Sequence, residues 1–89
     1  MISSEETLFE FPCEFPIKVM GEAEEHFDAL VVEIVRRHCP DLTEGAVKSR
    51  LSQKGKYVSV TVTIQAQSRK QLDNIYMDLT AEDRVLMAL

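Results

Sequence analysis

Two histidines and two cysteines are the side chains best able to do chemistry in this chain of 89 residues. His38 and Cys39 are adjacent, but neighbouring residues of a helix point apart, so they do not form a base–nucleophile pair. His26 falls near the start of a predicted helix and His38 at its end, where both are expected to have structural or solvated roles. Cys13 and Cys39 lack metal-ligand spacing and are expected to be free thiols. We therefore predict no enzyme, no cofactor and no metal.

Charged residues around the first predicted helix could bind a small ion. Residues 22–28 hold four acids that could recruit a cation, but a solvated helix start explains them better. Lys18 lies just before the helix and Gly21 opens it, where free backbone N–H groups favour anions. One alternative function is therefore the binding of a small anionic metabolite at Lys18, Met20 and Gly21. The simpler interpretation is a solvated lysine beside a turn glycine.

Basic residues follow in the second half of the chain, without an intervening acid: Lys48, Arg50, Lys54 and Lys56. The net charge is −5, but residues 1–45 hold eleven acids and three bases, and residues 46–89 hold seven bases and four acids. Because the two halves fold together, this predicts opposed surface patches. RNA binding is a further alternative, but RNA-recognition sheets stack bases on aromatic side chains, and here only Tyr57 is available. Protection of a sheet edge explains the same lysines, so nucleic acid is the weaker expectation.

Residues 57–66 alternate strictly between apolar and polar side chains, which predicts a β-strand with one face in the core. Further alternating patterns predict strands at 15–20, 46–53 and 84–89, and the strand at 46–53 is expected to form a hairpin with 57–66. Helical patterns predict a first helix at 22–38 and a second helix that begins after Ser68, with Gln71 in its capping box. Because the 57–66 strand has one apolar face, both helices must cover that face. The predicted fold is an α+β ferredoxin-like βαββαβ sandwich with a four-stranded antiparallel sheet.

The last predicted strand is apolar on both faces, which is unusual for a strand at a sheet edge. Leu86 and Leu89 therefore indicate that something docks there, either the N-terminal arm or a second subunit. The predicted organisation is an N-terminal arm at 1–13 and a single domain at 14–89. No apolar stretch approaches the roughly 18 residues of a membrane span, and the acidic start lacks the basic region of a signal peptide. A cytoplasmic protein without membrane contact is expected.

Several segments together resemble the small bacterial YbeD-like family, also called lipoate regulatory proteins. They are Glu10-Phe-Pro12, Phe15, Lys18-Val-Met-Gly21, Val35-Arg-Arg-His38, Ser52-Gln-Lys-Gly-Lys-Tyr57 with Ser59 and Val60, and Arg84-Val-Leu-Met-Ala-Leu89. The resemblance implies a ferredoxin-like fold close to ACT regulatory domains. Those domains typically pair and bind amino acids or similar effectors near the first strand–helix loop, here Met20-Gly21-Glu22. The Asp and Pro-Gly motif of amino-acid-binding ACT domains is missing from this chain.

The leading expectation is a non-enzymatic regulatory or protein-interaction domain. Its partner is either a second copy, giving a homodimer, or an unknown protein. The small-anion sensor and the RNA binder are the two alternatives.

Overall fold

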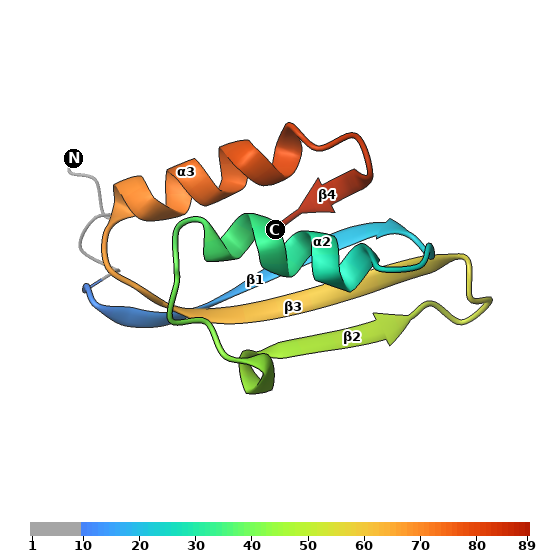
Figure 1. Cartoon of the computed structure of the whole chain (residues 1–89), viewed down its shortest axis with the longest axis horizontal. Coiled ribbons are helices and arrows are strands. Elements are labelled where there is room, and N and C mark those ends of the chain that lie inside the picture. The colour runs from blue at the N-terminus through green and yellow to red at the C-terminus, as the bar shows by residue number, and fades with distance from the viewer. Residues whose placement is uncertain (1–9) are drawn as a thin grey trace, which may run out of the picture.

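A computed structural model describes residues 10–89 and shows one four-stranded sheet with two helices on one side (Figure 1). The elements are β1 (Cys13–Glu22), α2 (Phe27–Arg36), a 3-10 turn η1 (Glu44–Ala46), β2 (Val47–Leu51), β3 (Tyr57–Ala66), α3 (Arg69–Thr80) and β4 (Val85–Ala88). The strand order is β2-β3-β1-β4, and all neighbouring strands are antiparallel. This arrangement confirms the predicted ferredoxin-like fold.

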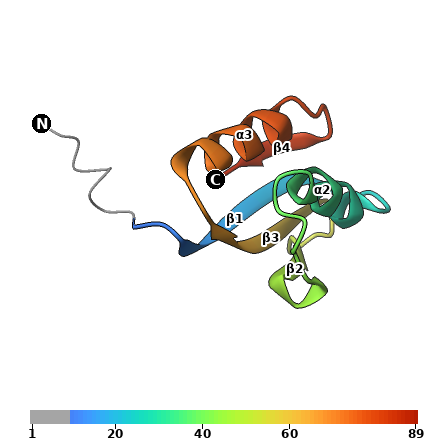
Figure 2. The same cartoon turned by 60° about the vertical axis from the view of Figure 1, so that its left-hand side comes forward.

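The core lies between the sheet and the two helices, which Figure 2 shows covering the same side of β1 and β3. Alternate residues of the central strands are buried there: Ile17 and Val19 of β1, and Val60, Val62, Ile64 and Ala66 of β3. The helices add Phe27, Val31, Ile34, Val35, Leu72, Ile75 and Leu79. The alternation of residues 57–66 therefore predicted correctly which face of β3 is covered.

The predicted boundary between the first strand and the first helix is wrong. β1 does not end at Gly21, because Gly21 and Glu22 still pair with Val58 and Tyr57 of β3. Residues 23–26 then form a turn in which His26 adopts a left-handed backbone conformation with φ of 65°. Helix α2 begins only at Phe27, so the acids at 22–25 precede the helix instead of forming its first turn.

The N-terminal arm is described only from residue 10 onwards. Phe11 and Cys13 are half-buried against the core, and Cys13 already begins β1. The rest of the predicted arm, and with it the hypothesis that the arm covers Leu86 and Leu89, lies outside the described residues.

The Arg84 side chain links the start of β4 to the β1–α2 turn through an ion pair and a hydrogen bond. Its Nε lies 3.1 Å from Oε1 of Glu24, and its Nη2 donates to the carbonyl oxygen of Glu25 at 3.1 Å. Its guanidinium also lies 5.9 Å from the centre of the Phe27 ring. Gly21 lies beneath this cluster, where a Cβ atom would be 2.5 Å from the Phe27 ring and 2.7 Å from the Arg84 carbonyl oxygen. Only glycine fits at this crossing.

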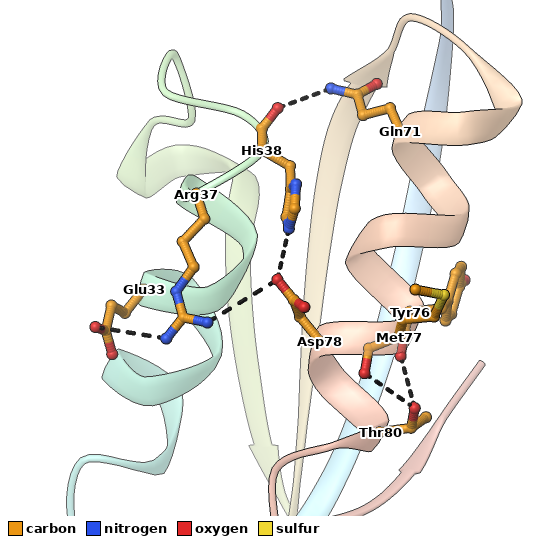
Figure 3. A network of polar contacts seen from close by, with 8 residues as sticks. All are labelled: Glu33, Arg37, His38, Gln71, Tyr76, Met77, Asp78 and Thr80. Atoms are coloured by element: carbon orange, nitrogen blue, oxygen red, sulfur yellow. Dashed lines mark hydrogen bonds and ion pairs between the residues drawn. The ribbon is translucent and has the colours of Figure 1, made fainter.

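Polar contacts join the end of α2 to α3 (Figure 3). Nε2 of His38 donates to Oδ2 of Asp78 at 2.7 Å, and Nη1 of Arg37 lies 3.9 Å from the same oxygen. Nε2 of Gln71 donates to the His38 carbonyl oxygen at 2.9 Å. The predicted N-cap is confirmed, because Oγ of Ser68 accepts from the Gln71 N–H, but the Gln71 side chain accepts from the Gln67 N–H and not from that of Ser68. His38 thus has a structural role between the helices.

Replacing Gly21 by alanine is expected to lower the free energy of unfolding by roughly 2 kcal/mol, because the new methyl group overlaps the Phe27 ring and the Arg84 backbone. Urea denaturation of the full chain measures this. Gly45→Ala is the matched control, since no atom lies within 4 Å of its added Cβ. Equal effects of the two substitutions would contradict the close packing at Gly21.

Replacing Asp78 by alanine is expected to cost about 1 kcal/mol of stability, since it removes a partly buried hydrogen bond to His38. The control is Asp73→Ala on the same helix, whose carboxylate forms only an exposed pair with Arg69. That change is expected to cost less than about 0.5 kcal/mol. Thermal denaturation of both variants compares them, and an Asp73→Ala loss as large as that of Asp78→Ala would refute the coupling of the two helices.

Candidate functional site

The face of the sheet opposite the helices is uncovered by residues 10–89, and we call it the open face. Directly paired residues of antiparallel strands share a face, so the register places the side chains. One row across the open face contains Lys48, Thr61, Lys18 and Leu89, and the next contains Arg50, Ser59, Met20 and Met87. The rows run from the β2 edge to the β4 edge. The open face therefore combines residues from all four strands.

The structure brings together residues that the sequence assigned to separate sites. Lys18 was predicted to belong to an anion site, whereas Lys48 and Arg50 were predicted to belong to a basic hairpin. All three are exposed on the open face, where Lys18 and Lys48 are the two neighbours of Thr61. Sequence spacing alone could not show this, because the β1–β3 and β2–β3 registers decide which side chains share a row.

The other two hairpin lysines lie at the end of the sheet. Gly55, with φ of 71°, forms the tip of the β2–β3 connection, and Oγ of Ser52 accepts from the N–H groups of Lys56 and Tyr57. The Lys56 ammonium lies 5.9 Å from the centre of the Tyr57 ring. Lys54 and Lys56 are exposed on this tip. They extend the basic surface beyond the two rows.

The β4 side of the open face is apolar. Leu86, Met87 and Leu89 are 56%, 49% and 62% exposed, and Met20 is half-buried next to Met87. Leu86 falls at a register shift between β1 and β4, which leaves it without a directly opposed residue in β1. Within residues 10–89, no strand pairs with the outer side of β4. An apolar edge and an apolar surface are therefore continuous here.

The structure does not assemble the predicted anion site from Lys18, Met20 and Gly21. Gly21 is buried on the core side beneath Phe27, whereas Lys18 and Met20 are on the open face. The loop predicted at Met20-Gly21-Glu22 is instead part of β1. The start of α2 lies on the core side of the sheet, away from the Lys18 side chain, because α2 packs against β3 there. The three residues therefore do not converge on one ligand.

A hollow of about 440 Å³, lined by both polar and apolar residues, lies at the end of the molecule opposite the β2–β3 tip, and the sequence did not indicate it. Cys39 lines it, and Nε2 of Gln71 lies 3.3 Å from the Cys39 sulfur. Burial raises the pKa of the Cys39 thiol above its ordinary value, and the carboxylate of Asp41 raises this pKa further. The thiol is therefore held in its protonated, weakly nucleophilic form at neutral pH.

Among residues 10–89, no group of three or more His, Cys, Asp and Glu side chains is placed to hold a metal ion. None of the helices described here combines the length and apolarity needed to cross a membrane.

Comparison with known proteins matches this chain to similar sequences and to similar solved structures. Residues 6–89 match a family model described as "Protein of unknown function (DUF493)". A UPF0250 protein of Chromobacterium violaceum is 48% identical over the full length of both chains. UPF0250 protein NE1487 of Nitrosomonas europaea is 44% identical and covers 97% of this chain and 99% of its own.

The solution structure of protein HP0495 from H. pylori has the same fold. Its TM-score is 0.71 at 16% sequence identity, with 98% of this chain and 91% of that chain covered. The sequence resemblance to YbeD-like proteins is confirmed by the full-length relatives. The chain therefore belongs to the DUF493, or UPF0250, family of proteins of unknown function.

Proposed function

We propose that this protein is a non-enzymatic regulatory and interaction domain of the cytoplasm that pairs with a second copy through β4. The observation that carries the proposal is the uncovered apolar edge formed by Leu86, Met87 and Leu89. Sheet edges invite pairing with another strand unless charges, prolines or covering segments prevent it. Strand β4 itself contains neither a charged residue nor a proline.

Of the two edge strands of the sheet, β2 carries charged residues that protect it from pairing with another strand, and β4 does not. Strand β2 carries Lys48 and Arg50, which disfavour pairing with a second β2. Strand β4 presents only apolar side chains. Lys18 and Leu89 exchange both backbone hydrogen bonds, at 3.0 Å and 2.8 Å, so the N–H and C=O groups of Ala88, the preceding residue, point to the free side. These groups are available to an added strand.

Pairing of two β4 strands would join two sheets side by side. The exposed apolar side chains of each copy would then lie beside those of the other, which reduces the apolar area in contact with water. If the two β4 strands pair antiparallel, both helical layers would lie on the same side of the extended sheet.

Two of the four groups best able to do chemistry, His38 and Cys39, are engaged in structural contacts, which supports a non-enzymatic role. His38 bonds to Asp78 between the helices, and Cys39 carries a thiol of raised pKa. The small-anion alternative requires Lys18, Met20 and Gly21 to converge on one ligand. Lys18 and Met20 lie on the open face of β1, whereas Gly21 lies on its core side. RNA binding retains the cations of the open face, but the described strands place a single aromatic ring there, that of Tyr57 at the end of the sheet.

Self-association through β4 predicts that sedimentation velocity at micromolar concentration shows a concentration-dependent dimer. Leu89→Glu is expected to shift the protein to monomer, because it places like charges together at the paired edge. Met77→Glu is the matched control, since Met77 is also 62% exposed but lies on α3. A wild-type chain that stays monomeric, or a dimer that both substitutions weaken equally, would contradict the proposal.

The raised pKa of the Cys39 thiol predicts slow alkylation. In a Cys13→Ser variant, the rate of reaction with iodoacetamide is followed as a function of pH, in the folded chain and in urea. Because the thiolate is the nucleophile, the folded chain should react more slowly at neutral pH, and its rate–pH midpoint should lie above that of the unfolded chain. A midpoint below that of the unfolded chain would point to an activated thiol and to enzyme chemistry.

A further inference from the structure

We propose that the open face binds an acidic, partly apolar segment of another protein. The inference rests on the proposed interaction role but not on the pairing through β4, because it uses the face of the sheet and not its edge.

The charge of the open face is opposite to that of the whole chain. The chain carries a net charge of −5, whereas the open face holds Lys18 on β1 and both Lys48 and Arg50 on β2. The acids on the same face, Glu14 and Glu22, lie at the two ends of β1. In the part of the chain that is described, the three cations form no ion pair. They are therefore available to carboxylates of a partner.

The open face changes from cationic to apolar across the strands. In one row, Arg50 on β2 is followed by Ser59, Met20 and Met87, and in the next row Lys48 is followed by Thr61, Lys18 and Leu89. The small hydroxyl residues between the two ends, Ser59 and Thr61, are half-buried, and each lines a hollow of this face. Lys18 and Lys48 are two strands apart, about 9.6 Å at the usual strand spacing. A matching partner presents carboxylates over β2 and β1 and apolar side chains over β4.

The same observations favour a polypeptide over other occupants. Nucleic acid would bind the cations, but the strands of residues 10–89 offer a single aromatic ring on this face for base stacking. That ring, of Tyr57, already has the Lys56 ammonium over it. A second open face would bring the same cations against each other. Exposed Met and Leu side chains suit apolar side chains of a protein. Charge complementarity and apolar area therefore point to the same class of partner.

The test uses the full chain and a fluorescein-labelled synthetic peptide of glutamate and leucine, with binding followed by fluorescence anisotropy. Binding is expected to weaken with added salt. Lys18→Glu and Lys48→Glu should each weaken it by about tenfold, because each reverses a contact charge. Lys70→Glu makes the same charge change at an exposed site on α3, and it should weaken binding by less than about twofold. Melting temperatures of the three variants verify that they fold.

Three results would overturn the proposal. The first is an equal loss of affinity in the Lys18→Glu and Lys70→Glu variants, which would reflect net charge alone. The second is equal affinity for poly-L-glutamate, which would remove the role of the apolar side. The third is tighter binding of oligouridylate, which would make the open face a nucleic-acid surface. Sedimentation of Lys48→Glu, whose charge lies on the strand farthest from β4, is expected to show the wild-type dimer. This sedimentation measurement reports on the dimer alone, so it separates failure of this inference from failure of the self-association proposal.

Discussion

The one-sided burial of β3 is the constraint on which the rest of the structure depends. Val60, Val62, Ile64 and Ala66 are buried on one face, and the residues between them are polar. Only one face of this central strand can therefore stabilise a hydrophobic core, and both helices must pack against it. Residues 10–89 leave the opposite face uncovered. A domain of this size thereby gains a broad open surface without any separate binding element.

The same constraint accounts for where charges and special residues lie. With both helices on one side, the β1–α2 turn must pass close to the start of β4, and Gly21, Phe27 and Arg84 meet there. Arg84 pairs with Glu24 at this point, so part of the acidic segment is used to hold the chain together. Lys18, Lys48 and Arg50 remain on the opposite face without such partners among residues 10–89. The acidic chain thus presents a basic surface.

The fold could be predicted from sequence because it depends on periodicity. The strand at residues 57–66 and the capped helix beginning after Ser68 are local patterns, and the structure reproduces both. The start of α2 could not be predicted correctly, because the pairing of Gly21 and Glu22 with β3 overrides the helix-favouring glutamates that follow. The local sequence pattern does not show that strand pairing with the distant β3 competes with helix formation at this point.

Individual residues of the candidate site could be predicted from sequence, but their common position on one face of the sheet could not. Lys18 and Lys48 were each singled out, but their common face depends on the β1–β3 and β2–β3 registers. Leu86 and Leu89 were identified correctly as apolar residues of an edge strand, since a two-sided apolar strand is recognisable from sequence. The hollow beside Cys39 was missed because its walls come from separate segments, including Glu14, Thr63 and Gln71.

The central claim is that this protein makes its contacts through the open face and β4 and not through its helices. A photo-crosslinking amino acid placed in the living cell at Lys18, at Met87 or at Lys70 tests it most directly. The account predicts discrete crosslinked species, containing either a second copy or another protein, from Lys18 and Met87, and none from Lys70 on α3. Crosslinks of the same kind from Lys70, or only from Lys70, would contradict it.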